Sequence, residues 1–583
     1  MCGFFGYLNK SKISSDTKKK FKNIDIFLNN RGPDFSNHIK GSNFFIKHWR
    51  LKIQDLESRS NQPYTNSKVN LLYNGELYNF KKLKKNKKIQ SKYITTGDTE
   101  VLFNYLNDLG IKNTLNQIEG MFSFIYHNKK TNKIYLARDR FGQKPLYYFM
   151  NDSEFIFSSE IKPIIYMLGK KNEIDINELK NYFYQNLYYG KEKTFFNKIK
   201  QVLPGTYLTF ENFKLRKETY YDSNNINKNK KRFSIKSFSE NIKNTVDKHL
   251  IADKDICLSL SGGVDSKSLI AVIKKSKYKK NLKKSYSFSF KGFKSEDKDA
   301  KKFSKLLGIK HENIIISRSD IIQNFKKLIQ INEGPIGGVA NIAMLLLCKK
   351  IKQDGFNVLL GGYGMDEALY GYNSFNFFDH KKNTDFRMPD ITTNFNLFHK
   401  DFVKGFNEHS ADRLKYQMMF DDKIPRTVHM CDRFSMINSV ELRLPYLDHV
   451  FIENVSNYFY EDYYYKKSNI SKRPLREFLR SLNLKNVPSW IFKKNHNPSP
   501  QNIWLKQEPI KSWIYKHLNS NKLYKKFDFL KKKEILKAWK LYLNTNKKLN
   551  GYFFWQLLNL YYLMDIDNFK YSKIKMNNFY MIK

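Results

Sequence analysis

Residues Ile256–Ile273 read ICLSLSGGVDSKSLIAVI, and this stretch decides the fold class of the larger part of the chain. Residues 256–260 form a short apolar run that is typical of a buried strand. Residues 267–273 carry apolar side chains at helical spacing, and the glycine-containing loop Ser261–Ser266 joins the two. A strand, a loop and a helix in this order predict one repeat of a parallel α/β sheet. The backbone N–H groups at the helix start would form a cradle for an anion.

Two more apolar runs, Tyr286–Phe290 and Asn357–Leu360, follow along the chain and alternate with helical segments. Strands that alternate with helices predict a parallel α/β domain, which we expect over residues 233–583. Its C-terminal part reads as added amphipathic helices.

Residues 2–210 show a different pattern, in which short strand-like runs are separated by turn residues and a few helices. The run Pro204–Phe210 is predicted to be the last strand of this part. Residues 223–232 are polar, charged and without periodicity, so we expect an interdomain linker over 211–232. A chain of 583 residues is too long for one core, which agrees with a multidomain α/β protein.

The chain has a formal net charge of +49, which in principle favours a nucleic acid or an anionic membrane as partner. Lysine is, however, spread along the whole chain together with abundant Asn, Ile, Phe and Tyr, which is the pattern of a compositional bias. We therefore expect no specific nucleic acid and no membrane as partner. A nucleic-acid-associated protein stays open as an alternative from another class, and it would keep its binding at physiological salt.

Four cysteines are scattered without CxxC spacing, which argues against a disulfide framework and against a zinc site. The N-terminus lacks the pattern of a signal peptide, and no apolar run reaches membrane-spanning length. These features predict a cytoplasmic protein.

Cys2 is the first candidate for chemistry, because removal of Met1 would leave its thiol and a free α-amine on one residue. The amine has an ordinary pKa near 8 and can act as the base that activates the thiol. Taken alone, Cys2 is better explained as an incidental small apolar residue, and the companion motifs reverse this preference. These motifs are Arg31–Asp34, His48–Leu51, Asn74–Asn79, Thr96–Glu100 and Arg138–Tyr148.

The companion motifs supply the groups that hydrolysis of an amide by a thiol requires. Asn74 can donate to an oxyanion through its side-chain amide, and Gly75 through its backbone N–H. Arg50 suits a carboxylate, whereas Asp98, with Glu76, suits an ammonium group. Asp98 or Thr96 could also cap a following helix. Taken alone, Asn-Gly is typical of a hairpin turn. Together, these groups describe a site for free glutamine.

In this order behind Cys2, residues 2–210 resemble the class II (Ntn-type) glutamine amidotransferase domain. The resemblance implies a four-layer αββα sandwich and the hydrolysis of glutamine to glutamate and ammonia. It makes Cys2 the nucleophile and places Asn74 and Gly75 in the oxyanion hole. The glutamine ligands that it implies are Arg50, Ile53, Asn74, Gly75, Glu76 and Asp98.

The loop Ser261–Ser266 is not a Walker loop, because it lacks the Gly-Lys-Ser/Thr ending. Its Asp265 is suited to magnesium. The motif resembles the PP-loop of ATP pyrophosphatases, which have the adenine nucleotide α-hydrolase-like fold. With the segments Leu359–Tyr372, Asp432–Met436 and Val440–Asp448 behind the glutaminase motifs, the chain resembles the asparagine synthetase B family from Cys2 to about Trp504.

The resemblance implies that ammonia passes through an internal tunnel to a carboxylate activated by ATP as an acyl-adenylate. The small-molecule substrates are then glutamine, ATP and aspartate, with Mg²⁺ held by Asp265 and Asp366, and a homodimer is one option for the assembly. Lys494 matches the spacing of the family's catalytic lysine. The ATP-binding residues that the resemblance implies are Ser259, Ser261, Gly262, Gly263, Asp265, Ser266, Phe290, Gly361 and Gly362.

The chain departs from the family where the acceptor and ammonia should meet. Tyr363 replaces the family's acidic residue, which resembles β-lactam synthetase, where a tyrosine pairs with a glutamate as the base. Three residues are candidates for such a partner, namely Asp421, Asp422 and Asp432. The usual Lys-x-Gly-Phe is also changed, in Lys494–Asn497. Two acceptors are therefore open, namely aspartate and another carboxylate, on a sugar, a peptide or a secondary metabolite.

Overall fold

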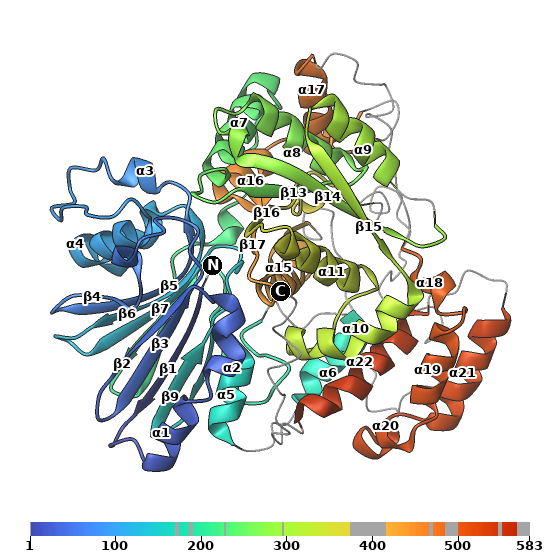
Figure 1. Ribbon diagram of the computed structural model, residues 1–583, viewed down its shortest axis with the longest axis horizontal. Coiled ribbons are helices and arrows are strands. Elements are labelled where there is room, and N and C mark those ends of the chain that lie inside the picture. Colours follow the sequence, from blue (N-terminus) through green and yellow to red (C-terminus); the bar gives the residue numbers. More distant parts are fainter. Residues whose placement is uncertain are drawn as a thin grey trace.

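The computed structural model describes residues 2–169, 174–185, 191–226, 229–293, 296–372, 415–465, 470–483, 499–545 and 551–567. Two antiparallel sheets form the N-terminal part of the chain, and a parallel sheet with helices on both faces forms the part that follows (Figure 1). Lys494 lies outside the described residues.

The N-terminal part contains two sheets of six strands each. The first has the order β10-β8-β9-β1-β3-β2 and the second the order β12-β11-β7-β6-β5-β4. The first sheet consists of β1 (Gly3–Asn9), β2 (Phe35–Lys40), β3 (Phe44–Arg50), β8 (Tyr147–Met150), β9 (Glu154–Ser158) and β10 (Lys200–Gln201). The second consists of β4 (Tyr64–Thr65), β5 (Val69–Leu77), β6 (Gly120–Asn128), β7 (Lys133–Arg138), β11 (Thr206–Glu211) and β12 (Lys214–Thr219).

Alternation along the strands builds the four layers. Phe4 of β1 packs into the core between the sheets together with Leu72 of β5, whereas its neighbour Phe5 packs on the outer face of the first sheet. Helices α1 (Ser15–Phe21), α2 (Asp25–Leu28) and α5 (Ile161–Leu168) lie on that face, and α3 (Phe80–Leu83) and α4 (Thr99–Gln117) cover the second sheet. Helix α6 (Ile176–Gln185) lies instead beside α22 (Tyr552–Asp567), whose Gln556 donates to the Tyr182 carbonyl oxygen at 2.8 Å. The predicted αββα sandwich is confirmed.

The second sheet continues beyond the run that was expected to end it. Strand β12 pairs with β11, with Phe210 opposite Leu215. The expectation that Pro204–Phe210 is the last strand is therefore wrong, and part of the expected linker is a strand. The reason is physical: β12 lies at the edge of the sheet with mostly exposed polar side chains, so it shows no apolar alternation.

The following part has a five-stranded parallel sheet of order β15-β14-β13-β16-β17, which confirms the predicted parallel α/β domain. Its strands are β13 (Ile256–Ser259), β14 (Leu282–Phe290), β15 (Lys310–Ile316), β16 (Val358–Leu360) and β17 (Glu441–Arg443). The chain leaves β13 toward β14 on one side and returns as β16 on the other. The carboxyl end of β13 is thus a topological switch point, where open α/β sheets bind ligands.

Helices cover both faces of this sheet (Figure 1). Those near the sheet are α7 (Ile235–His249), α8 (Val264–Lys275), α9 (Asp297–Leu306), α10 (Arg318–Asn332), α11 (Ala340–Gln353), α12 (Met365–Ala368), α15 (Lys423–Met436), α16 (His449–Ser456) and α17 (Arg473–Ser481). The predicted C-terminal helices are α18 (Gln501–Trp504), α19 (Ile510–Leu518), α20 (Asn521–Lys526), α21 (Lys532–Asn544) and α22 (Tyr552–Asp567). In the part of the chain that the structure describes, no helix combines the length and apolar character needed to cross a membrane.

Candidate active sites

Cys2 directly precedes β1, and its side chain is buried. Its backbone N donates to Asn74 Oδ1 at 3.0 Å, and its carbonyl oxygen accepts from Arg31 Nε at 3.1 Å. Burial raises the pKa of the Cys2 thiol, while the charge of the amino terminus and Arg50 act to lower it. The predicted nucleophile and the predicted oxyanion residue are thus in direct contact.

Asn74 and Gly75 lie within β5, so their Asn-Gly pair is not a hairpin turn. The Asn74 side-chain oxygen accepts the hydrogen bond from Cys2 N. Its Nδ2 is buried and has no hydrogen-bond partner among the described residues. A Cβ on Gly75 would lie 2.2 Å from the Met121 carbonyl oxygen, so only glycine fits this close approach to β6. The strand thus presents an unused amide donor beside Cys2.

The acidic residues lie around the same strand. Asp98 Oδ2 accepts from the Tyr73 hydroxyl at 2.8 Å and from Leu77 N at 2.8 Å. Asp98 precedes α4 but makes no side-chain cap, so the capping prediction for Asp98 is wrong, because its carboxylate turns to β5 instead. Glu76 accepts from Gln54 Nε2 at 2.6 Å. Burial raises the pKa of both carboxyl groups.

Arg50 ends β3 and braces the loop that follows. Its guanidinium donates to the Glu57 carbonyl and to Asn61 Oδ1, each at 2.8 Å, and also to the Asp55 carbonyl. The braced loop carries Ile53, which is buried. A glutamine carboxylate would therefore share this guanidinium with the loop.

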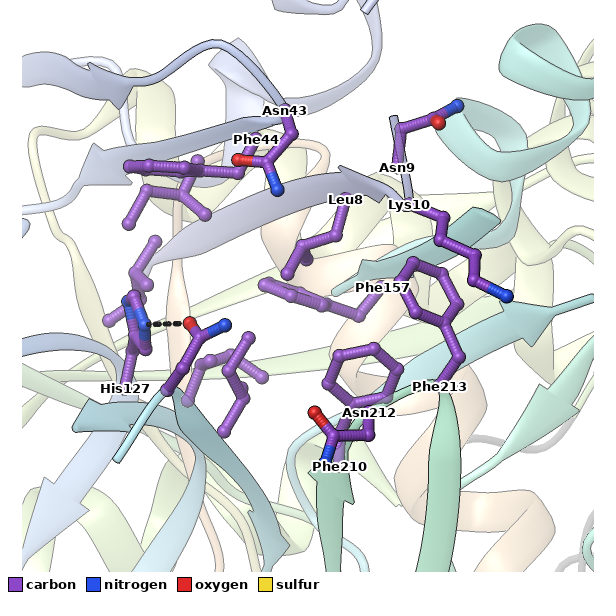
Figure 2. Close-up of a pocket in the computed structure, with 15 residues that line it drawn as sticks. Leu8, Asn9, Lys10, Asn43, Phe44, His127, Phe157, Phe210, Asn212 and Phe213 are labelled. Carbon is purple, nitrogen blue, oxygen red and sulfur yellow. Dashed lines mark hydrogen bonds between the residues drawn. The ribbon is translucent and has the colours of Figure 1, made fainter. Parts of the chain in front are cut away.

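A cavity of about 410 Å³ lies at the other end of the sandwich (Figure 2). It is lined by Leu8, Phe44, Phe157 and Phe213, with Asn9 and Lys10 at its edge. Cys2 and Leu8 stand at opposite ends of β1, which separates them by about 20 Å at the rise of a strand. This cavity is thus not the predicted glutamine site.

The predicted ATP loop joins β13 and α8. Its serines bond within the loop, because Ser266 Oγ accepts from Ser261 N at 3.0 Å and Ser261 Oγ accepts from Gly263 N at 3.1 Å. No side chain caps the first turn of α8. The helix start can therefore offer its N–H groups to phosphate.

The other predicted ATP residues lie at the same edge of the sheet. Ser259 ends β13, Phe290 ends β14, and Gly361 follows β16 directly. A Cβ on Gly362 would lie 3.5 Å from Ser266 N, so the Gly361–Gly362 loop lies against the start of α8. The structure thus brings the predicted ATP residues together.

Asp265 and Asp366, the two predicted magnesium ligands, converge on one ammonium group. Lys472 Nζ lies 2.6 Å from Asp265 Oδ2 and 2.6 Å from Asp366 Oδ1. Burial raises the pKa of Asp265 to about 6 although Lys472 acts to lower it. Two convergent carboxylates that already bind a cation fit Mg²⁺, which needs one or two carboxylates besides phosphates. Lys472 carries no motif that the sequence could reveal, since it is one lysine among many.

Tyr363 follows the Gly361–Gly362 loop, and 36% of its surface is exposed. Its hydroxyl is at the buried end of the side chain, where desolvation and the nearby Cys431 and Cys348 thiols raise the pKa of Tyr363 well above its usual range. Asp432, one of its three predicted partners, instead binds Arg31 at 2.8 Å and lies 3.7 Å from Lys144. Asp422 pairs with Arg426 at 3.8 Å. Asp432 and Asp422 thus have partners other than Tyr363, whose hydroxyl lies near the Cys431 thiol.

Comparisons with known proteins match both parts of the chain that carry these residues. The glutamine amidotransferase domain family matches residues 1–221, and the asparagine synthase family matches residues 237–565. Asparagine synthetase [glutamine-hydrolyzing] 3 of Bacillus subtilis is 27% identical over 551 residues, which covers 86% of this chain and 87% of that protein. Asparagine synthetase [glutamine-hydrolyzing] 1 of the same organism is 26% identical over 585 residues, with 88% and 89% covered.

A relative with another name also matches. Amidase chyE of Penicillium rubens is 23% identical over 406 residues, which covers 64% of this chain and 60% of that protein. The two family matches together span both described sites, and the asparagine synthase match alone covers more than half of the chain. The chain therefore belongs to the asparagine synthase family of glutamine-hydrolysing, ATP-dependent ligases.

Proposed function

We propose that this ligase hydrolyses glutamine at Cys2 and transfers the ammonia to a carboxylate activated at the 261–266 loop. The contact between Cys2 and Asn74 carries the proposal most directly. Asn74 fixes the Cys2 nitrogen through its oxygen and keeps a buried Nδ2 without a partner among the described residues. Such an amide is preorganised to donate to an oxyanion.

The first reaction takes place at the N-terminal site. After removal of Met1, the Cys2 amine accepts the thiol proton, and the thiolate attacks the side-chain carbonyl carbon of glutamine. Asn74 Nδ2 and Gly75 N–H stabilise the oxyanion. The Cys2 ammonium group then returns its proton to the leaving nitrogen, so that collapse of the intermediate releases ammonia and leaves a thioester. Water then hydrolyses the thioester to glutamate. Asp98 and Glu76 hold the substrate ammonium group, which offsets the cost of keeping these carboxylates charged while buried.

The second reaction takes place at the edge of the parallel sheet. The 261–266 loop binds the phosphates of ATP, and the acceptor carboxylate attacks the α-phosphate, which expels pyrophosphate and forms an acyl-adenylate. Ammonia then attacks the acyl carbon, and AMP leaves. Asp265 and Asp366 would hold Mg²⁺, which supplies positive charge to the phosphates. The Lys472 ammonium group lies between these carboxylates. It can move from them to bind the phosphates. Lys494 keeps its predicted role at the adenylate as an expectation.

We propose L-aspartate as the first acceptor to test, with L-asparagine, L-glutamate, AMP and pyrophosphate as products. The relatives that are named asparagine synthetases and cover most of the chain support this choice. A second candidate is another carboxylate, on a sugar, a peptide or a secondary metabolite. The tyrosine at position 363 favours it, because the family has an acidic side chain there.

The Cys2→Ala variant separates the two reactions. With glutamine as the nitrogen donor it should form no product, whereas ammonium with Mg-ATP and aspartate should still support synthesis. Glutamate release by the variant would refute Cys2 as the nucleophile. Absence of asparagine in both proteins, with glutamine hydrolysis intact in the parent, would refute aspartate as the acceptor.

A further inference from the structure

The cavity at the far end of the N-terminal sandwich lies between the two sheets and has apolar walls (Figure 2). From the first sheet, it is lined by Leu8 of β1 and Phe157 of β9. From the second sheet, it is lined by Ile125 of β6 and Phe210 of β11. All four side chains pack in the apolar cluster between the sheets. The volume of about 410 Å³ lies within the range of pockets that bind small molecules.

A glycine in β1 makes room for the cavity. Side chains alternate along a strand, so Phe4, Gly6 and Leu8 occupy the positions of β1 that face the second sheet. Gly6 is paired with Phe157 of β9, and a Cβ on Gly6 would collide with the Phe157 ring. The ring therefore leans over β1 and takes the place of the side chain that Gly6 lacks. It lies along the first sheet rather than reaching toward the second, which leaves space between the sheets.

Phe213 borders the cavity from a turn whose backbone is unfavourable for a large residue. Asn212 and Phe213 are the central residues of the β11–β12 hairpin, which Glu211 and Lys214 close as a pair. Both have a left-handed backbone, with φ values of 49° and 55°. Such hairpin turns favour Asn-Gly, and a bulky residue with positive φ is strained. The Phe213 ring packs against Phe210, with ring centroids 5.3 Å apart, so the strained turn holds an aromatic ring at the cavity.

The edge of the cavity is polar and carries positive charge only. Lys10 is the single charged side chain among the described residues that line it. His127 adds no charge at neutral pH, because burial lowers the pKa of its imidazole. Its ring nitrogens lie 3.2 Å from Asn132 Oδ1 and 3.3 Å from Asn70 Nδ2, so both already have partners. The Asn43 side-chain amide offers a further hydrogen-bond donor, and this edge therefore suits an anionic group.

We propose that this cavity is a binding site for a small aryl carboxylate, with the aromatic ring between the two sheets and the carboxylate at Lys10. Aromatic rings prefer edge-to-face or offset contacts with other rings, and the cavity offers such partners in Phe157, Phe210 and Phe213. Lys10 attracts the carboxylate, and no acidic side chain among the described lining residues repels it. A bound ring also supplies the packing contacts that side chains around a cavity lack. The site goes beyond the proposed function, because β1 separates it from Cys2 by about 20 Å.

The test measures the dissociation constant of cinnamate, an aryl carboxylate, by isothermal titration calorimetry with the full chain and no other ligand. The parent should bind one molecule per chain. Leu8→Trp places a large side chain in the cavity and should weaken binding at least about tenfold. Leu215→Trp is the matched control, because Leu215 packs against the same cluster from β12 but does not line the cavity. This control should keep the parental dissociation constant.

Cinnamamide, the uncharged amide of the same shape, tests the role of the charge. The parent should prefer cinnamate over cinnamamide by about two- to fivefold, which is the contribution of one exposed ion pair. Lys10→Gln should remove this preference. Phe213→Gly suits the left-handed turn and removes one ring from the cavity, so it should fold and weaken the binding of cinnamate by about threefold or more.

Circular dichroism verifies the fold of each variant. A parent without saturable binding of cinnamate, or a folded Leu8→Trp variant that binds like the parent, would overturn the proposal. Should Leu8→Trp not fold, parental affinity in Phe213→Gly overturns it instead. A preference for cinnamate that survives in Lys10→Gln would contradict the position of the carboxylate. Since no assay contains glutamine, ATP or an acceptor, these outcomes are independent of the proposed function.

Discussion

Replacement of Asn74 by alanine should disable glutamine hydrolysis and leave the synthetase reaction intact. The Asn74 side chain binds the Cys2 nitrogen at 3.0 Å and holds a buried Nδ2 without a partner in the described part of the chain. Loss of one preorganised oxyanion donor lowers kcat by about 10²–10³, which corresponds to about 2.7–4 kcal/mol of transition-state stabilisation. Loss of the hydrogen bond to the Cys2 nitrogen should lower kcat further.

The assay measures glutamate release at saturating glutamine, followed by product formation from ammonium in the same preparation. The glutamine KM should change little, because Asp98, Glu76 and Arg50 keep their places. Asn70→Ala is the matched control. Asn70 is a buried asparagine on the same strand, and its side chain binds Thr65 Oγ1 at 2.7 Å, away from Cys2. The control should retain hydrolysis.

Two results would refute this reasoning. An Asn74→Ala variant that keeps more than about a tenth of the parental kcat would show that its amide does not stabilise the oxyanion. A parallel loss of the ammonium-dependent reaction would show instead that Asn74 supports the fold of both domains.

Three further predictions concern the synthetase domain and its interface. Lys472→Met should lower ATP–pyrophosphate exchange at least about 10²-fold, because it removes an ammonium group that can bind the phosphates beside Asp265 and Asp366, and glutaminase activity should persist. Tyr363→Phe should lower amide formation from ammonium by about 10²-fold while exchange continues, because the protonated hydroxyl can no longer donate to the oxyanion formed at the acyl carbon, and unchanged amide formation would exclude this role. Burial raises the pKa of Glu441, but the amino-terminal charge and Arg443 lower it to about 2, so its stabilisation is present above about pH 4.5 and lost as pH falls toward about 2. In denaturant titrations, Glu441→Gln should therefore be less stable than the parent at pH 7, with a smaller difference at pH 3, and a constant difference would contradict the assignment.

Local motifs carried the predictions that succeeded. The strand, loop and helix around Ser261–Ser266 are contiguous, so periodicity and glycine placement determine their geometry. The Asn74–Gly75 pair was open to a hairpin interpretation, and only its position within β5, against the Met121 carbonyl, decides the matter.

Features that depend on distant parts of the chain were not predictable. Lys472 lies 207 residues from Asp265, and nothing in its neighbourhood distinguishes it from other lysines. The Arg31–Asp432 pair exists only because the two domains dock. Tyr363 was expected to meet a carboxylate, but the helix that approaches it presents Cys431. In each case tertiary packing, rather than local sequence, selects the partner.

Nitrogen transfer between the sites is the central claim, and one isotope experiment tests it most directly. The purified enzyme would receive glutamine labelled with 15N in its side-chain amide, together with Mg-ATP, aspartate and an excess of unlabelled ammonium. The account predicts that the amide of the product carries a larger share of the label than the free ammonium in the same reaction, because ammonia released at Cys2 reaches the acyl-adenylate inside the protein. Label found only in free ammonium, with none in the product amide, would contradict it.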